Sequence, residues 1–454
     1  MSNGNPSVLE RLFALRERRT TVRTEVLAGV TTFVTMAYIL FVNPQILGAA
    51  AGPGTFAAVL TSTALVAAVM TIAMGLVANL PLALASGLGL NAVVAFQLCG
   101  AMKLSYPQAM GVIVAEGLAI TALVATGLRQ AVVRAVPMNM KRAIGIGIGL
   151  FLAIIGFKEA GFVSAGGGLL TLGQHGHLQG FPVVLFALTL VFTAWLVARN
   201  VTGALLIGIA VSTVIAVATK ALFGGAGFAP QVANIPSSLV ALPDFSLVGG
   251  VEFSFVSILG GTTAALTVFS IMLSDFFDTV GTVVAVGQEA KYLDEEGNFP
   301  RPSAVLLVDS LAAAAGGAAG ASSATTYIES ASGAAAGGRT GLTAVVTGLL
   351  FAACLFLSPL AGVVPPQATG AVLVLVGFMM MREVGSITWD DPTEAIPAFL
   401  TLTVMPFTYS ITNGIGAGFV TYVVLKLLTG RGREVKPLMA GAAVAFVVYF
   451  ALAT

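Results

Sequence analysis

Long apolar runs, most of them near 20 residues, follow one another along this 454-residue chain from residue 26 onward. A helix needs about 20 apolar residues to cross the hydrocarbon core of a bilayer. Only 9% of the residues are charged, against about 25% in a typical soluble domain. The sequence therefore predicts an all-α polytopic membrane protein and excludes a water-soluble enzyme. The runs are too long and too continuous for the alternating strands of an outer-membrane barrel.

About fourteen membrane segments can be marked, the first at 26–46 and the eighth at 255–286, and the distribution of Lys and Arg tests this count. With the N-terminus in the cytoplasm, only Lys103, Lys158 and Lys220 of the 21 basic residues fall outside, and the other 18 fall inside. Cytoplasmic loops are enriched in Lys and Arg. We therefore expect a multi-pass protein of the cytoplasmic membrane with a cytoplasmic N-terminus. The apolar stretch 437–453 either spans the bilayer or lies against the bundle.

Two segments, 84–99 and 322–335, are too short and too rich in Gly and Ser to cross as ordinary helices. They count as segments three and ten, so they occupy the same place in two halves of seven segments each. Residues 136–161 resemble 364–385, and 200–214 resemble 410–424. Seven is an odd number, so the second half must be inverted in the membrane relative to the first. Inverted repeats with paired broken helices are typical of secondary transporters, whose substrate site lies where the broken segments meet.

A cluster of carboxylates lies inside these segments, although each costs at least roughly 2.5 kcal/mol to insert. In SDFFDTVGT, Asp275 and Asp278 fall on one helical face together with Thr279 and Thr282. Glu329 lies in the short segment ten, and Asn91 is the only strongly polar side chain of SGLGLNAVVAF in segment three. The polar stripe of segment eight predicts a cavity between these segments.

Other polar residues in the segments have simpler interpretations. Glu116 and Asp309 are lone carboxylates that we expect to pair with backbone groups or hydroxyls. Tyr38 is a candidate lining residue of the cavity. Cys99 and Cys354 lie in apolar runs, and the pair His175 and His177 is typical of a loop. No spacing of these residues indicates a metal or another cofactor.

The candidate site residues indicate the kind of ligand. Carboxylates accept hydrogen bonds, an amide donates and accepts, and half-helix ends offer free backbone groups. Such a set suits a small, flat, neutral heterocycle with N–H donors and ring-nitrogen acceptors. A buried carboxylate can also carry a proton, which makes proton coupling plausible. The net charge of +1 gives no bulk charge that would favour nucleic acid.

Four stretches resemble the Azg-like branch of the nucleobase–cation symporters, in the xanthine/uracil permease superfamily. They are SDFFDTVGT, TTYIESASGAAAGGRTGLTAVVTGLLF, SGLGLNAVVAF and GRGREVKPLM. The branch comprises adenine, guanine and hypoxanthine permeases, and the resemblance runs from about residue 8 to the C-terminus. It implies import of a purine nucleobase by proton symport through alternating access, in a protein that is not an enzyme.

The resemblance also implies roles for individual residues. Asp275 and Glu329 are expected to hydrogen-bond the nucleobase, and Asn91 to take part in purine recognition. Asp278 is expected to serve proton coupling, together with Glu329. Backbone at the two breaks is expected to line the substrate site, at Gly87, Leu88, Tyr327 and Ile328. Ser86 stands where many relatives have Pro, which leaves the preferred purine open.

The family fold implied by the resemblance has a core domain and a gate domain, each built from both halves, and relatives form homodimers through the gate. We therefore expect a cytoplasmic segment 1–25, core residues 26–128 and 255–360, gate residues 129–222 and 361–428, a connection 223–254 and a C-terminal segment 429–454. An anion exchanger of the sulfate/bicarbonate type on the same fold is the main alternative. Carboxylates at the half-helix ends would repel an anion and argue against it.

Overall fold

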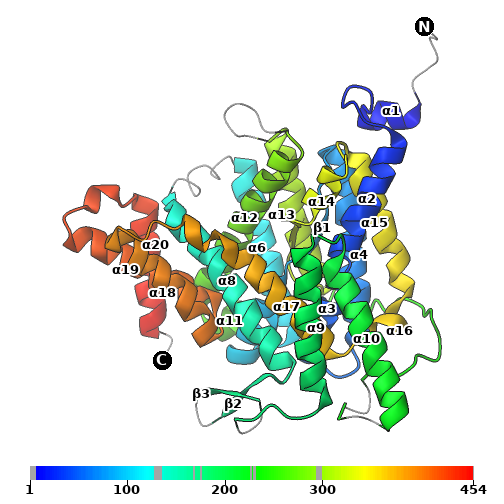
Figure 1. The fold of residues 1–454 in the computed structure, drawn as a ribbon. Helices are drawn as coiled ribbons and strands as arrows, with labels where there is room; N and C mark the ends of the chain where they lie inside the picture. Colours follow the sequence, from blue (N-terminus) through cyan, green and yellow to red (C-terminus); the bar gives the residue numbers. More distant parts are fainter. Residues whose placement is uncertain are drawn as a thin grey trace.

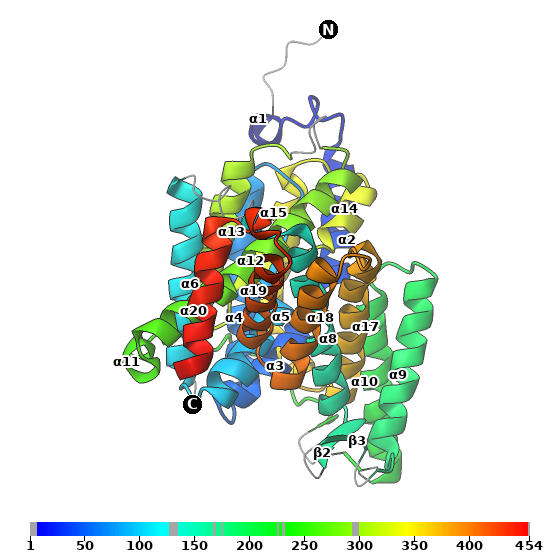
Figure 2. The ribbon, with the colours of Figure 1, turned by 90° about the vertical axis from the view of Figure 1, so that its left-hand side faces the viewer.

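The computed structural model describes residues 7–126, 135–166, 169–173, 176–224, 227–228, 232–292 and 299–452. The expected boundary between 26–128 and 129–222, and His175, lie outside the described residues. Figures 1 and 2 show a bundle of helices with the short helix α1 (Val8–Phe13) at one end and the strands β2 and β3 at the opposite end.

Ten helical spans among the described residues are long and apolar enough to cross a membrane. They are α2 with α3 (Val22–Met36 and Ile39–Ala51), α4 (Phe56–Val77), α6 (Tyr106–Thr126), α8 (Met138–Glu159), α9 (Phe181–Ala198), α10 (Ala204–Phe223), α12 (Gly261–Glu289), α13 (Pro302–Ala319), α17 (Pro366–Met381, extended by η3 Arg382–Ser386) and α19 (Ile411–Leu428). The predicted polytopic helical protein is confirmed at this level, and the count of fourteen segments stays a prediction.

Shorter helices complete the bundle. They are α11 (Phe255–Leu259), α15 (Gly341–Ala353), η2 (Cys354–Phe356), α16 (Ser358–Ala361), α18 (Pro392–Thr408), η4 (Gly432–Glu434) and α20 (Pro437–Leu452). α18 begins with Pro392 behind the N-cap Asp391, whose carboxylate accepts from the Thr393 amide at 3.0 Å. α20 comes from the predicted stretch 437–453, and it packs against α19.

Three details correct the sequence-based expectation. The predicted run 26–46 is two helices, α2 and α3, which meet at Ala37 and Tyr38. The run 255–286 is divided by Gly260, whose positive φ of 77° separates α11 from α12. The fold is also not purely helical, because it contains two small antiparallel sheets, β1 (Leu84–Ser86) with β4 (Ala324–Thr326), and β2 (Val163–Gly166) with β3 (Leu169–Leu172).

The two short segments fold as strands followed by half-helices. Segment three is β1, α5 (Leu88–Ala92) and the π-helical turn η1 (Val93–Ala101), and segment ten is β4 and α14 (Ser330–Ala335). β1 pairs with β4 in the register Leu84↔Thr326 and Ser86↔Ala324. Extended backbone is stable within the hydrocarbon region of a membrane only where it is buried in protein and hydrogen-bonded. Pairing the two breaks with each other satisfies that requirement along their shared edge.

Helices α8 and α17 cross in close backbone contact. A Cβ built on Gly377 would lie 2.3 Å from the Gly149 carbonyl oxygen, and one built on Gly156 would lie 2.5 Å from that of Gly370. Gly149 and Gly156 are seven residues apart on α8, and Gly370 and Gly377 are seven residues apart on α17. The two glycines of each helix therefore lie on the same face of that helix. Small residues at helix crossings in membranes permit this approach.

We expect Gly377→Ala to lower stability by about 1–3 kcal/mol, because the added methyl group overpacks the crossing. The matched control is Gly145→Ala on α8, where a Cβ would meet nothing within 4 Å. The thermal midpoint of each purified variant in detergent measures the effect. Equal midpoints for the two variants would contradict the importance of this crossing.

A network of charged residues holds the C-terminal segment. Lys426 is fully buried on α19, and its Nζ lies 2.9 Å from Glu394 and 2.7 Å from Glu434. Arg431 pairs with Asp391 at 2.6 Å and with Glu434 at 2.7 Å. Hydrogen bonds from Thr393 and Arg431 lower the pKa of Asp391 to about 2. Those from Arg431 and Lys426 lower the pKa of Glu434 to about 2.

A carboxylate whose pKa is depressed by folding stabilises the folded state above its unfolded pKa, and the effect disappears as the pH falls toward the folded value. We expect Glu434→Gln to lower the thermal midpoint at pH 7, and the gap to wild type to narrow as the pH falls from about 5 toward 2. The exposed Glu383→Gln serves as the control. A gap that stays constant across this pH range would contradict the contribution of the network.

Candidate functional site

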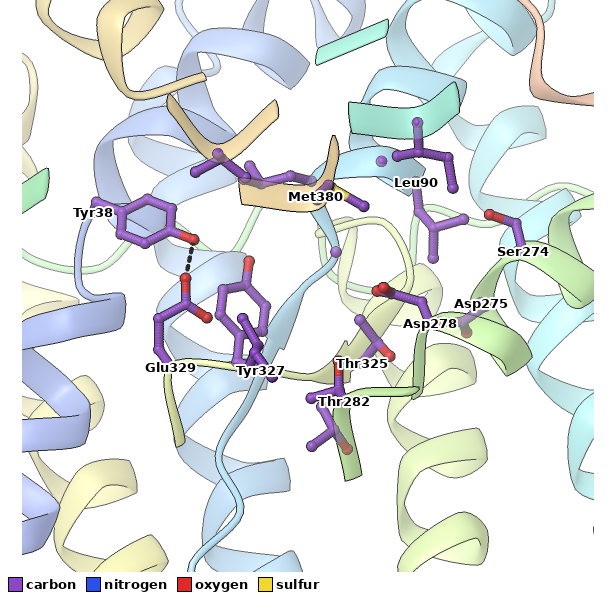
Figure 3. Close-up of a pocket in the computed structure, with 17 residues that line it drawn as sticks. Tyr38, Leu90, Ser274, Asp275, Asp278, Thr282, Thr325, Tyr327, Glu329 and Met380 are labelled. Atoms are coloured by element: carbon purple, nitrogen blue, oxygen red, sulfur yellow. Dashed lines mark hydrogen bonds between the residues drawn. The ribbon is translucent and has the colours of Figure 1, made fainter. Parts of the chain in front are cut away.

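A cavity of about 100 Å³ lies where the two broken segments meet. One water needs roughly 10–15 Å³ of such space, so the cavity has room for a small ring compound. Its lining comes from segment three, α12, segment ten, Tyr38 between α2 and α3, and the helices α8 and α17. Figure 3 shows Tyr38, Tyr327 and Glu329 on one side of this space, and Asp278 and Ser274 on the other.

Most of the predicted site residues line this cavity. They are Gly87, Leu88, Asp275, Asp278, Tyr327, Ile328 and Glu329. Asp278 is exposed to the open space, and its carboxyl group points toward Tyr327 and Glu329 (Figure 3). Their roles in binding and in proton transfer stay predictions.

Asn91 does not line the cavity. Its side chain is fully buried and lies 2.6 Å from the Ser86 hydroxyl, which also contacts the Ala321 carbonyl. One hydroxyl has one proton, so it donates to one of these oxygens at a time. With the amide turned so that Nδ2 donates to Ser86, that hydroxyl is free to donate to Ala321. In this structure Asn91 supports the end of β1, and its role in purine recognition stays a prediction.

Glu329 begins the half-helix α14 as its N-cap residue, and the Tyr38 hydroxyl donates to its carboxylate at 2.5 Å. Figure 3 shows this hydrogen bond at the edge of the cavity. The bond connects the kink between α2 and α3 to the break in segment ten. Tyr38 was a sequence candidate, and the structure places it in the lining.

The outer edges of the two strands are hydrogen-bonded by side chains from neighbouring helices. On β1, the Thr71 hydroxyl of α4 accepts from the Leu84 amide at 2.9 Å and contacts its carbonyl at 2.9 Å. On β4, the Asp309 carboxylate of α13 accepts from the Thr326 amide at 2.9 Å and from its hydroxyl at 2.8 Å. Asp309 also accepts from Thr279 at 2.7 Å. The interpretation of Asp309 as a carboxylate paired with backbone and hydroxyls is confirmed.

Apolar side chains from α8 and α17 close the cavity opposite the strands, and sequence reasoning missed them. They are Ile148, Val376 and Met380. These residues lie within the two segments whose similarity marked them as equivalent parts of the repeats, but nothing in their apolar pattern distinguished lining from core. Flat apolar walls with a few polar groups are typical of sites for small organic ligands.

The site offers acceptors rather than cationic groups. Among the residues that the structure describes, its side chains include three carboxyl groups, the hydroxyls of Tyr38 and Tyr327, and those of Ser274, Thr282, Thr325 and Thr326, but no Lys, Arg or His. Among the described residues, no three His, Cys, Asp or Glu side chains form a group that could hold a metal ion. The arrangement can bind N–H donors and can hold or pass a proton.

Comparison with known proteins gives concordant results. Residues 23–417 match the Permease family. The chain is 42% identical to adenine permease AdeP of Escherichia coli (strain K12), over 97% of this chain and 95% of that protein. It is 39% identical to guanine/hypoxanthine permease PbuO of Bacillus subtilis (strain 168), over 96% and 99%.

Among solved structures, the fold resembles the transmembrane domain of a cyanobacterium bicarbonate transporter, BicA. The TM-score is 0.60 at 17% identity, and the match covers 87% of this chain and 97% of that domain. The structure of SLC26A9 matches with a TM-score of 0.62 at 11% identity, over 93% and 69%. At this low identity, the two likenesses show a shared fold and no more.

Removing a hydrogen bond at the outer edge of a strand should lower the stability of the protein. We expect Thr71→Val to lower stability by about 1–3 kcal/mol, because it leaves the buried Leu84 amide without its acceptor. Thr403→Val is the matched control, since the Thr403 hydroxyl donates at 2.7 Å to a carbonyl of its own helix. Thermal unfolding of both purified variants measures the difference, and identical midpoints would show that the strand edge needs no such partner.

Proposed function

Because the chain belongs to the Permease family, we propose that it is a secondary transporter that imports purine nucleobases together with protons. The observation that carries the proposal is the cavity between two paired half-helix breaks. In the described part of the chain it is lined by carboxyl groups and by no cationic side chain. The purine permeases that it resembles over nearly its whole length support the same substrate class. Adenine, guanine and hypoxanthine are the candidates.

A purine fits the chemistry of this cavity. Its N–H groups can donate to the carboxylates of Asp278, Asp275 and Glu329, and its ring nitrogens can accept from backbone amides at the two breaks, near Gly87 and Ile328. The apolar side chains of Ile148, Val376 and Met380 can lie against the flat faces of the rings. Glu329 is held by Tyr38 and therefore presents its carboxylate in a fixed orientation.

We further propose that the chain contains fourteen segments in two inverted repeats, with core residues 26–128 and 255–360 and gate residues 129–222 and 361–428. The packing supports this architecture, because pairs of helices recur in equivalent positions. α4 packs on α15 as α13 packs on α6, and α9 packs on α10 as α18 packs on α19. Thr71 and Asp309, on the equivalent helices α4 and α13, bind the two strand edges in the same way.

Alternating access then follows from movement of the core against the gate. The cavity lies between segments three and ten of the core and helices α8 and α17 of the gate. A relative displacement of the two domains would open it to one side at a time. We assign the N-terminus to the cytoplasm and the protein to the cell membrane, on the charge distribution of the loops. Proton binding at Asp278 or Glu329 would favour substrate binding from outside, and the gate would form the interface of a homodimer.

Anion exchange of the sulfate/bicarbonate type is the second candidate, because the fold resembles that of a bicarbonate transporter. An anion held at half-helix N-termini would meet Asp278 and Glu329 in the same cavity. The negative charges of these carboxylates would repel the anion. The nucleobase proposal therefore fits the lining better.

Uptake of radiolabelled adenine and hypoxanthine tests the proposal in cells that lack their own purine permeases. We expect uptake by the wild type, with competition by unlabelled purines and not by uracil. Glu329→Gln should reduce uptake about 10- to 100-fold, because a hydrogen bond to a charged group contributes about 1.5–3 kcal/mol. Glu159→Gln makes the same change at the exposed end of α8 and should keep wild-type uptake.

Membrane levels of all variants are compared by immunoblot, so that a loss of uptake is not confused with a loss of protein. If no nucleobase enters or competes, the substrate proposal is wrong. Uptake of labelled bicarbonate or sulfate by the same cells would then support the anion exchanger.

A further inference from the structure

One carboxyl group in the bundle has no part in the proposed binding of substrate. Glu116 lies in the middle of α6, is fully buried, and does not line the cavity. α6 packs against α12, which carries Asp275; this residue is 1% exposed and lies at the cavity wall. Both carboxyl groups lie within hydrogen-bonding distance of one hydroxyl group, that of Ser323. We call these two residues the acid pair.

The hydroxyl of Ser323 lies between the two acids. Its Oγ lies 3.1 Å from Asp275 Oδ2 and 3.3 Å from Glu116 Oε2. A serine hydroxyl has one proton, so it donates to one of these carboxyl groups at a time. The remaining oxygens, Asp275 Oδ1 and Glu116 Oε1, are buried and have no hydrogen-bond partner among the described residues. The acid pair therefore has more acceptor oxygens than donors.

The ion pairs at Lys426 and Arg431 in the described part of the chain belong to the C-terminal network and include neither residue of the acid pair. The titratable groups on the elements packed against α6 are Asp275, Asp278 and Glu289 of α12, Asp309 of α13 and Cys99 of η1, besides Tyr106 of α6 itself. The elements packed against α12 add Lys141, Arg142, Lys158 and Glu159 of α8, Tyr422 and Lys426 of α19, and Tyr449 of α20. Of these basic groups, Lys141 lies over the Phe277 ring and Lys426 belongs to the C-terminal network. The carboxyl groups among them can only add negative charge.

Two adjacent buried carboxylates cannot both ionise without a large electrostatic penalty. On the transport function proposed above, we propose that Glu116 and Asp275 hold one proton between them, that Asp278 takes this proton up from the cavity and passes it to them, and that it is the proton carried with the substrate. The proton enters from the external water through the cavity, where Asp278 lies one helical turn from Asp275. It leaves to the cytoplasmic water after the site has opened inward, so that one proton crosses in each cycle.

Ser323 provides a physical connection between this proton and the substrate site. Its carbonyl accepts from the Gly87 amide at 2.9 Å, and Gly87 is the N-cap of the half-helix α5 that lines the cavity. Loss of the proton leaves two carboxylates competing for the Ser323 hydroxyl. The backbone of Ser323 extends the pairing between β1 and β4. A shift of this residue would therefore move the backbone at both breaks.

Transport by purified protein in proteoliposomes tests the proposal. With a pH gradient, inside alkaline, wild type should accumulate labelled hypoxanthine or adenine above equilibrium. Glu116→Gln keeps the size of the side chain but cannot take up or release a proton. We expect it to lose gradient-driven accumulation and to retain exchange of internal unlabelled for external labelled nucleobase, within about twofold of wild type. Glu159→Gln is the matched control and should behave as wild type in both assays.

Accumulation by Glu116→Gln at the wild-type level would overturn the proposal. If this variant does not fold, infrared spectroscopy of the wild-type protein during a pH titration gives an independent answer. The carbonyl band of a protonated, buried carboxylic acid should be present at neutral pH, and should be lost in Asp275→Asn. Absence of this band in the wild type would also overturn the shared proton. Failure of the wild type to exchange any nucleobase would refute the substrate proposal instead, and the infrared band would still test the proton.

Discussion

The pairing of β1 with β4 is the interaction on which the rest of the structure depends. A bilayer offers no water to an unpaired backbone group, so extended chain at this depth must have every donor and acceptor occupied. The strands bind each other along one edge, and Thr71 and Asp309 bind the outer edges at Leu84 and Thr326. The two half-helices that border the cavity can begin in the middle of the bundle only because these bonds are made.

The same pairing couples two parts of the chain that are more than 200 residues apart in the sequence. Neither break can move by itself without losing backbone hydrogen bonds in a dry environment. On the alternating access proposed above, the strands, their edge partners and the acid pair would therefore move as one body against α8 and α17. Those helices meet through glycine pairs at Gly149 and Gly377 and at Gly156 and Gly370, which makes the opposite wall equally compact.

The sequence predicted the helical membrane class and the two broken segments. It also named eight candidate site residues, and seven of these line the cavity. These features follow from local pattern, because hydropathy and helical spacing are properties of neighbouring residues. The position of Asn91 could not be predicted in this way, since the face of a five-residue helix that meets the cavity depends on packing. The apolar lining at Ile148 and Met380 depends on which helices are neighbours, and no single segment contains that information. The same is true of the shared hydroxyl that brings Glu116 close to Asp275.

Lys426 joins three separate parts of the chain, α18, α19 and η4, in one network of charges. Its ammonium group is fully buried, and of its two close partners Glu394 precedes it in the chain while Glu434 follows it. A fully buried ammonium group that lost one of these partners would keep a charge that is not fully neutralised and that water cannot reach. The turn at Glu434 is therefore held to the bundle by charge as well as by apolar packing.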